Sequence, residues 1–451
     1  MHVPSHWPTR PQRKLWMPHC LDRGILLARN LASLAGDGSL FAATAMEKLE
    51  RLQAELQPLA ERYDVVVANP PYMGSSSLSK WNGKWIKDNF PEAYRDLCTS
   101  FIDRGFSLSN NQGYSAMVTM QSWMFLGSYE KLRGKLLRNH TISSMAHLGT
   151  RAFGAIGGEV VSTTATVFAN KKYDVPGTYL RLVDMGSEQE KAAGALEALA
   201  DPDCEWIFEC SPDVFGTIPG NPIGYWASEG IKRAFSIGDS LSSFVKMPYG
   251  FKTGDNEKFL RLWWECSESG INLTAATKEE AQSSSKKWFP YNKGGAFRKW
   301  YGNNEYLLNY ENGGEEVIGQ AKKQGRSAAD YDNSLLFKPV VTWSRISSGR
   351  LHMRYSPGGA ICDMTGSGYY GSEQTLKYLQ AFCNSSVALA VANIMSPTLD
   401  FQPGQIGSYP IIGVDTEINE VSKLVEALRY DSKQDWDAFE ESWDFNRHPL
   451  I

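Results

Sequence analysis

One unbroken apolar run dominates the hydrophobic pattern of the chain, and it stops at two prolines. Residues 63–74 read YDVVVANPPYMG, with apolar side chains over 65–68. A run that is continuous rather than alternating is typical of a parallel strand that is covered on both faces. We therefore predict a buried parallel strand over 64–68 that ends at Asn69.

Further helices and strands are predicted on both sides of this strand. Amphipathic patterns before it predict helices over 21–34 and 42–61. After a polar loop at 74–82, the predicted order is helix, strand, helix, strand and strand, over 94–108, 114–119, 129–137, 142–147 and 160–169. This succession predicts part of an open α/β sheet within 63–185.

The pattern changes in the second half of the chain. From residue 246 to about 368, glycines, aromatic residues and basic residues mix without a long helical period. The remaining segments are predicted as a helical connector, a helical region, a loop and a final helix, at 186–225, 372–395, 397–410 and from 417 onwards. We therefore expect a second, α+β domain after the connector.

The composition and the net charge of the chain are compatible with a nucleic-acid partner. The chain has 451 residues, enough for two or three domains, and 42% of them are hydrophobic. Its net charge is -4, so it has no overall basic signature. A mildly acidic protein can still bind nucleic acid through one local basic patch.

The spacing of the seven cysteines indicates whether the chain has a metal site, and the apolar runs indicate whether it is secreted or spans a membrane. No two cysteines have the C-x-x-C spacing of zinc ligands. Their odd number and wide scatter favour reduced thiols in the cytoplasm. The first residues do not read as a secretory signal, and the apolar run at 387–395 is too short to span a bilayer. We therefore expect a cytoplasmic protein without a metal site and without a membrane partner.

The tetrapeptide Asn69-Pro70-Pro71-Tyr72 is the strongest candidate site. Ligands of open α/β sheets bind beyond the carboxyl ends of the strands, which is where it lies. Proline has no N–H to donate and a restricted backbone, so this turn is a rigid group of acceptors with the Asn69 side-chain oxygen among them. Tyr72 adds a flat ring. Such a site suits an amino group on a flat ring, because two acceptors can hold both N–H bonds and leave the nitrogen lone pair directed at an electrophile.

Asn69-Pro70-Pro71-Tyr72 after an apolar strand resembles the (D/N/S)PP(Y/F) signature of amino-methylating DNA methyltransferases. The segments AYRDLCTSFIDRGFSLS, GYSAMVTMQSWMFL, ISSMAHLGTRAF and GGEVVSTTATVF resemble the later motifs of the N6-adenine type. YGFKTGDNEKFLRLWWE and IMSPTLDFQPGQIGSYPI resemble the target-recognition region of the large restriction-modification-like branch. SKQDWDAFEESWDF resembles the phage-growth-limitation methyltransferases of BREX phage-exclusion systems. The resemblance covers roughly residues 60–451.

The resemblance implies a fold and an activity. The fold would be a partial Rossmann-like sheet of an S-adenosylmethionine-dependent methyltransferase, followed by an α+β target-recognition domain. The implied segments are a helical N-terminal segment, the C-terminal part of the catalytic domain, a connector, the recognition domain and a helical tail, over 1–62, 63–185, 186–225, 226–415 and 416–451. The implied partners are double-stranded DNA and other phage-exclusion proteins.

The resemblance also assigns roles to residues of the site. Asn69 and the Pro70 carbonyl would hold the adenine N6, and Tyr72 would stack on the flipped base. Flipping is required because N6 cannot be reached for in-line attack inside the stack. Phe153 lies where such enzymes place a second aromatic ring, and it reads equally well as a core residue. S-adenosylmethionine would donate the methyl group, and no metal is needed.

One expected feature is missing from the sequence. The family places a glycine-rich loop after its first strand, where the loop holds the methionine end of the cofactor, and we find none. The apolar strand at 64–68 corresponds to the family's fourth strand. We therefore expect the chain to be a piece of a longer protein that lacks its amino-terminal side, and to bind S-adenosylmethionine weakly or not at all when alone.

The second domain carries a local excess of basic residues. Residues 246–350 contain sixteen Lys or Arg and twelve Asp or Glu. The segment SSSKKWFPYNKGGAFRKWYGNN places basic residues among aromatic ones, and basic groups neutralise phosphates while aromatic rings stack or wedge. The predicted DNA contacts are the basic and polar residues Lys252, Thr253, Asn256, Lys286, Lys287, Lys293, Arg298 and Lys299. A glycine-rich surface hairpin with solvated charges would have the same composition.

Three other functions compete with adenine methylation. A truncated module that reads DNA or a partner without methylating would also lack the glycine-rich loop. A fused endonuclease would need Pro-Asp followed by Glu/Asp-x-Lys, and neither 202–203 nor 212–213 has such a partner. Cytosine N4 is another possible target amine, because the same acceptors would hold it. Asn69 and the order of the motifs favour adenine.

Overall fold

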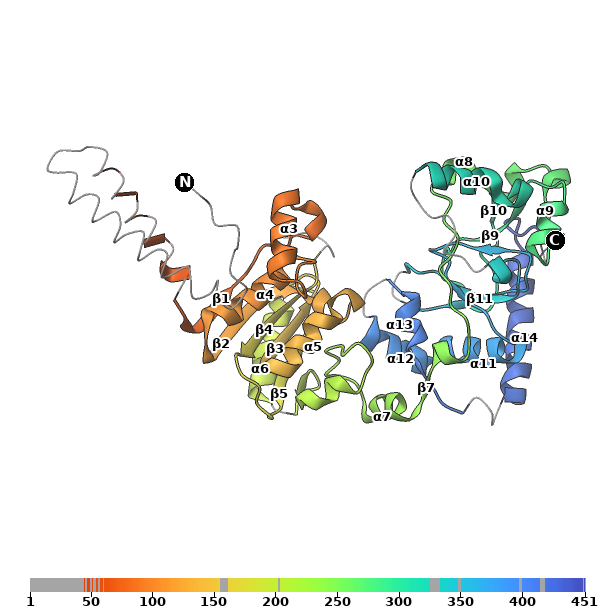
Figure 1. Ribbon diagram of the computed structural model, residues 1–451. Coiled ribbons are helices and arrows are strands. Elements are labelled where there is room, and N and C mark those ends of the chain that lie inside the picture. The colour runs from red at the N-terminus through yellow and green to blue at the C-terminus, as the bar shows by residue number, and fades with distance from the viewer. Residues whose placement is uncertain are drawn as a thin grey trace. The chain divides into compact units, whose positions relative to one another are not determined.

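The computed structural model describes residues 44–450, apart from gaps within 45–60 and at 155–160, 202, 325–332, 348–349, 397–399, 414–417 and 449. The chain divides into two compact units, shown in Figure 1. Unit 1 comprises residues up to Trp123 together with Lys131–Pro212. Unit 2 comprises Met124–Glu130 together with Asp213–Ile451.

Unit 1 is built on a six-stranded sheet with the order β1-β2-β4-β3-β5-β6. The strands are β1 Tyr63–Ala68, β2 Ser109–Met120, β3 Thr141–Gly149, β4 Thr163–Ala169, β5 Gly177–Arg181 and β6 Ile207–Cys210. β1 pairs in parallel with β2, and β3 in parallel with β5. The other neighbours are antiparallel, so the sheet is mixed. The predicted α/β class is confirmed.

Four α-helices accompany this sheet in the described part of the chain after β1. They are α3 Lys80–Asn89, α4 Leu97–Leu108, α5 Glu130–Asn139 and α6 Glu188–Ala200. α4 forms the crossover between β1 and β2 and approaches β2 closely. A Cβ atom added at Gly105 would lie 2.3 Å from the Ser115 Oγ and 2.6 Å from the Met117 Cε. The side chains at these β2 positions are buried, so one face of the sheet is covered here.

The opposite face of the sheet is open, which corrects one expectation. β1 was predicted to be covered on both faces, but Val65 is 57% exposed and Val67 is 74% exposed. The reason is that face coverage comes from elements packed on the sheet and not from strand pairing, and the described residues leave these two side chains uncovered. β1 is also the edge strand of the described sheet, with β2 as its one neighbour there. An apolar hollow of about 370 Å³ lies over this face, lined by Val67, Ala116, Val118, Val167, Leu180, Leu199 and others. The parallel pairing of β1 was predicted correctly.

Unit 2 contains three small sheets, with the orders β13-β9-β10-β8, β12-β11-β14 and β15-β7. Their strands are β7 Asp239–Ser240, β8 Leu260–Leu262, β9 Trp288–Asn292, β10 Tyr306–Asn309, β11 Val340–Trp343, β12 Met353–Ser356, β13 Ile361–Cys362, β14 Gly368–Tyr369 and β15 Pro410–Ile411. The helices are α7 Glu229–Ile237, α8 Asn256–Phe259, α9 Lys278–Ser283, α10 Glu311–Lys323, α11 Glu373–Cys383, α12 Ser386–Met395, α13 Pro403–Gly407 and α14 Ile418–Asp437.

Short 3-10 segments connect these elements. In chain order they are η1 Ser75–Ser77, η2 Gln121–Met124, η3 Gly127–Tyr129, η4 Pro212–Gly216, η5 Leu241–Ser243, η6 Trp263–Glu265, η7 Glu268–Gly270 and η8 Asn333–Leu335. Besides a small cluster of Val340, Cys362 and Tyr370, two larger hydrophobic clusters hold unit 2. One gathers around Trp343 and Leu376, and the other around Phe289 and Tyr310. α14 is fixed to α11 by Arg429, whose guanidinium bonds to Glu373 and Gln380 at 2.6 and 2.7 Å.

Most elements predicted from periodicity are present, with shifted ends. α4, β2, α5, β3 and β4 fall on the segments predicted as helix, strand, helix, strand and strand. The prediction missed two longer helices, α3, which begins inside the predicted loop 74–82, and α10, which lies in the region predicted to lack a long helical period. It was also wrong at short elements, because they carry too few residues for a period. β6 lies in the predicted helical connector, and α13 lies in the predicted loop. The helix expected over 21–34 lies outside the described residues. The domain limits drawn from the sequence remain predictions.

Candidate active site

The Asn69–Tyr72 segment lies at the carboxyl end of β1, as the sequence predicts. Asn69 and Pro71 are exposed, Pro70 is buried, and Tyr72 is half-buried. The Tyr72 hydroxyl donates a hydrogen bond to the Asn69 Oδ1 at 3.3 Å. Burial, with a smaller contribution from Cys98, raises the pKa of Tyr72, so its hydroxyl remains a donor at neutral pH. The Asn69 oxygen keeps a second lone pair for another donor.

Backbone contacts with the start of α4 hold this loop in place. The Leu97 N–H donates to the Met73 carbonyl at 2.9 Å, and the Ser75 N–H donates to the Arg95 carbonyl at 2.9 Å. Between them, Gly74 and Asp96 form a β-bridge. The loop that follows the prolines is therefore tied to a helix that packs on β2, and this limits its freedom to move.

Asp96 is the buried residue that joins the loop to α4. Its carboxylate caps the helix by accepting from the Cys98 N–H at 2.9 Å. Its carbonyl accepts from the Thr99 and Ser100 hydroxyls at 2.8 and 3.2 Å. Asp96 was not singled out from the sequence, although an aspartate directly before a helix is a recognisable capping signal.

The strand directions decide where Phe153 lies. β3 and β4 are antiparallel, as are β4 and β2, so β3 runs in the same direction as β1. The carboxyl ends of β1 and β3 therefore lie at the same edge of the sheet, three strand spacings or roughly 14 Å apart. Phe153 follows β3 at this edge and is half-buried. No contact between Phe153 and Tyr72 is present, and its stacking role remains a prediction.

A buried histidine lies near the same end of β3. A ring nitrogen of His147, Nε2, is 2.8 Å from the Gln121 Oε1. Burial and the positive charges of Arg181 and Lys191 lower the pKa of His147 to about 3. The imidazole is therefore neutral at pH 7. This pair links the end of β2 to β3 and was not singled out from the sequence.

The structure brings three predicted DNA contacts of unit 2 together. Lys252, Thr253 and Asn256 line one hollow of about 290 Å³, with Asp363 and Thr365 on its other side. The Thr253 hydroxyl donates to the Asn256 Oδ1 at 2.5 Å, which leaves the Asn256 amide hydrogens directed elsewhere. The arrangement offers a cation and amide donors in one place.

The five cations predicted between residues 286 and 299 do not all project freely. Lys286 donates to the Ser269 carbonyl at 2.5 Å, and Lys299 donates to the Asn384 carbonyl at 2.7 Å. The Arg298 guanidinium bonds to Asp435 at 2.8 Å. The two remaining amines lie over aromatic rings: Lys293 is 4.9 Å from the Tyr306 ring centre, and Lys287 is 5.5 Å from that of Trp288. Lys287 is the exposed one of the five.

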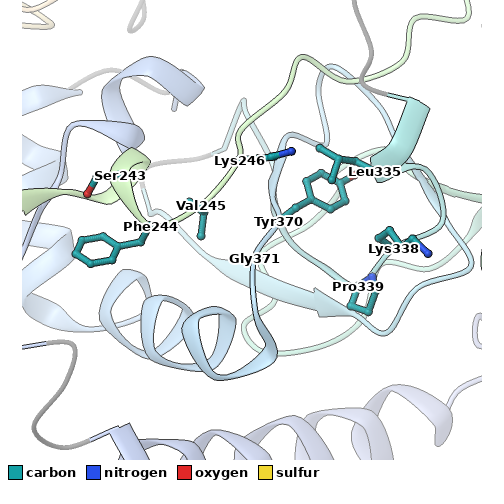
Figure 2. Close-up of a pocket in the computed structure, with 9 residues that line it drawn as sticks. All are labelled: Ser243, Phe244, Val245, Lys246, Leu335, Lys338, Pro339, Tyr370 and Gly371. Carbon is teal, nitrogen blue, oxygen red and sulfur yellow. The ribbon is translucent and has the colours of Figure 1, made fainter.

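A larger hollow of unit 2 was not found from the sequence. It has a volume of about 530 Å³, and Figure 2 shows the nine residues that line it. Lys246 and Lys338 lie on either side of the Tyr370 ring (Figure 2). The Lys338 amine donates to the Ala276 carbonyl at 3.1 Å. Because these residues come from three separate segments, no local motif indicates the hollow.

The described residues leave the sheet open beside Asn69. Beside Asn69 the sheet stops at β1, and no described strand pairs with its other edge. The residues present therefore do not enclose a cofactor there. Within the same residues, no group of three or more His, Cys, Asp or Glu side chains is placed to hold a metal ion. None of the described helices is long and apolar enough to cross a membrane.

Comparison with known proteins identifies relatives. Residues 29–153 match the family model of the Eco57I restriction-modification methylase. The chain is 38% identical over 398 residues to the adenine-specific methyltransferase PglX of Lacticaseibacillus casei (strain Zhang), which covers 87% of this chain and 33% of that protein. It is 37% identical over 433 residues to the adenine-specific methyltransferase BrxX of Escherichia coli O9:H4 (strain HS), with 93% and 33% covered. The chain thus spans about a third of the length of these relatives.

Among solved structures, the chain matches the ATP-dependent Type ISP restriction-modification enzyme LlaBIII bound to DNA. The TM-score is 0.48 and the identity 11%, over 85% of this chain and 31% of that one. The relationship to methyltransferases rests on the sequence matches.

Proposed function

We propose that this chain, which is homologous to the adenine-specific methyltransferases PglX and BrxX, carries the base-holding and DNA-reading parts of a DNA adenine-N6 methyltransferase. The observation that carries the proposal is the Asn69–Tyr72 loop, which lies at the carboxyl end of β1 and is tied to α4. As its family resemblance implies, we place the activity in phage defence, together with other phage-exclusion proteins.

The loop residues would act on an adenine that has been flipped out of double-stranded DNA. The two N6 hydrogens would donate to the Asn69 Oδ1 and the Pro70 carbonyl, and the adenine ring would stack on Tyr72. With both hydrogens held, the N6 lone pair points away from the loop. Phe153, at the same sheet edge, would contact the other face of the base. Holding the amine in this way raises the fraction of encounters with the geometry required for in-line attack.

S-adenosylmethionine would supply the methyl group from its sulfonium centre. Because the described residues leave the pocket open beside β1, we expect this chain alone to bind it weakly or not at all. Unit 2 would read the DNA. Its candidate contacts are the hollow of Lys252, Thr253 and Asn256 and the basic residues Lys286, Lys287, Lys293, Arg298 and Lys299.

A second function is favoured by the same open edge of β1. Without an enclosed cofactor pocket, the chain could bind DNA or a protein partner and transfer no methyl group. The two functions share unit 2 and differ in whether N6-methyladenine is formed.

The test combines a ligand titration with a product assay. The purified chain is titrated in a calorimeter with S-adenosylmethionine up to about millimolar ligand. The product assay then uses an enzyme that contains this chain and has a complete cofactor pocket, incubated with the ligand and phage DNA. Methylated bases are measured by mass spectrometry. N6-methyladenine that disappears in an Asn69→Ala variant, and persists in Asn139→Ala, would support the proposal. Methylation at cytosine N4 would contradict the choice of base. A chain that binds DNA and still forms no methylated base when its cofactor pocket has been completed favours the second function.

A further inference from the structure

Helix α3 is the first α-helix after the Asn69–Tyr72 loop and presents two large aromatic side chains to solvent. Trp81 is 73% exposed and Trp85 is 48% exposed. They are four residues apart, so they lie on the same face of the helix. Ile86 is the one buried residue of α3, which means that the helix makes little use of its apolar side chains inside unit 1.

The same helix is basic. Its ten residues contain three lysines and one acidic residue, Asp88. Lys80 and Lys84 are exposed, and neither forms an ion pair or hydrogen bond with a described residue. Lys84 lies between the two tryptophans in sequence. Exposed aromatic rings beside unpaired cations are the side chains that contact nucleic acid, where cations neutralise phosphates and rings stack on bases.

Although exposed, α3 is held close to the candidate site. It belongs to the segment 75–95. The two ends of this segment are joined by a hydrogen bond of 2.9 Å, which the Ser75 N–H donates to the Arg95 carbonyl. This is the same junction that holds the Asn69–Tyr72 loop. Ser79 caps α3 by accepting from the Asn82 N–H at 3.2 Å, and the Phe90 ring packs edge-on to Trp85 at 6.1 Å. Figure 1 shows α3 standing away from the sheet of its own unit.

We propose that α3 is a DNA-contacting element beside the base-holding loop, in which Lys80 and Lys84 bind backbone phosphates and Trp81 and Trp85 stack against bases next to the flipped adenine. The proposal rests on the proposed function for the position of the adenine. The excess of positive charge favours DNA over an apolar protein partner, because a protein interface core is depleted in lysine. Unstacking the bases next to a flipped adenine exposes their faces, and an indole ring can cover them.

The test measures DNA binding by the full chain with fluorescence anisotropy. Two fluorescein-labelled duplexes of the same sequence are compared, one fully paired and one with a single adenine opposite an abasic site. The unpaired adenine is less costly to extrude, so the wild-type chain is expected to prefer the second duplex. The double variant Trp81→Ala, Trp85→Ala is expected to lose roughly tenfold in affinity for the second duplex, and with it the preference.

The lysine variants should behave differently. Lys84→Ala is expected to weaken binding to both duplexes equally and to reduce the slope of log K against log salt by about 0.9, the loss of one phosphate contact. Lys131→Ala, an exposed lysine of α5, is the matched control. Leu196→Ala is the control for the tryptophans, because Leu196 is 69% exposed on the acidic helix α6 of the same unit. Neither control should change binding.

Two results would overturn the role of α3. In one, the α3 variants bind both duplexes as the controls do, and in the other, the wild-type chain binds neither duplex. The methylation assay keeps this test separate from the proposed function. Normal N6-methylation with unchanged DNA binding in the α3 variants would refute the role of α3 alone. Binding that depends on α3, in a chain that forms no N6-methyladenine even with a completed cofactor pocket, would refute the methyltransferase.

Discussion

At the scale of single residues, the proposed chemistry depends on the Asn69 side chain. Its Oδ1 already accepts a hydrogen bond from Tyr72, so the side chain is oriented before any base arrives. A preoriented acceptor pays no reorganisation when the amine begins to develop charge, which is why such groups have large effects on rate. The backbone carbonyl of Pro70 is the second acceptor and cannot be removed by a side-chain change.

Replacing Asn69 with Ala in an enzyme with a complete cofactor pocket should raise the barrier by about 3 kcal/mol or more, which is a loss of ~100-fold or more in rate. The reason is that one of the two acceptors for the amine is lost while the ring of Tyr72 remains. Single-turnover methylation of a duplex measures the effect, with Asn139→Ala as the control. Near-normal turnover of the Asn69→Ala variant would refute its assigned role.

At the scale of elements, close backbone approach shapes unit 2. The turn that contains Lys252 and Thr253 is held against the segment after β13, where the Phe251 N–H donates to the Cys362 carbonyl at 2.7 Å. Gly250 stands at this contact. A Cβ atom added there would lie 2.1 Å from the Asp363 carbonyl oxygen and 2.5 Å from the Met364 nitrogen, both of which are backbone atoms.

Gly250→Ala should therefore destabilise unit 2 by about 1–3 kcal/mol, since the backbone must move to admit the methyl group. Gly319→Ala is the matched control, because a Cβ atom at this position in α10 would meet nothing within 4 Å. It should be neutral or slightly stabilising, as alanine is the better helix former. Urea unfolding followed by tryptophan fluorescence compares the two. Equal stability of the two variants would contradict the role of Gly250.

At the scale of the whole molecule, unit 1 has an apolar sheet face and an edge strand that its described residues leave open. Val67 lies in this edge strand and on this open face. Its side chain is 74% exposed, although its sequence context is that of a buried strand. A parallel strand of this composition is normally covered on both faces.

Val67→Thr should change the free energy of unfolding by no more than about 0.5 kcal/mol, because the added hydroxyl remains in water. Val341→Thr is the matched control on the fully buried strand β11 and should cost about 1–3 kcal/mol, because its hydroxyl loses water without a ready partner. Denaturant unfolding of the isolated chain measures both. A large loss for Val67→Thr would mean that this face is covered in solution.

The sequence by itself determined the local features of this protein. It predicted the end of β1 at Asn69, the acceptor chemistry of the tetrapeptide and most of the regular elements, since periodicity and proline geometry are properties of neighbouring residues. The resemblance to adenine methyltransferases was also visible in the sequence, and the relatives confirm it.

Only the tertiary structure decided which of these features meet and which face solvent. The exposure of Val67 depends on which segments pack over its face of the sheet, and the anchoring of the loop depends on Arg95, Asp96 and Leu97, more than twenty residues away in sequence. The hydrogen bond between Arg298 and Asp435 also joins distant residues, because Asp435 lies 137 residues further along the chain. Burial and long-range contacts depend on the packing of distant segments, and no local pattern encodes that packing.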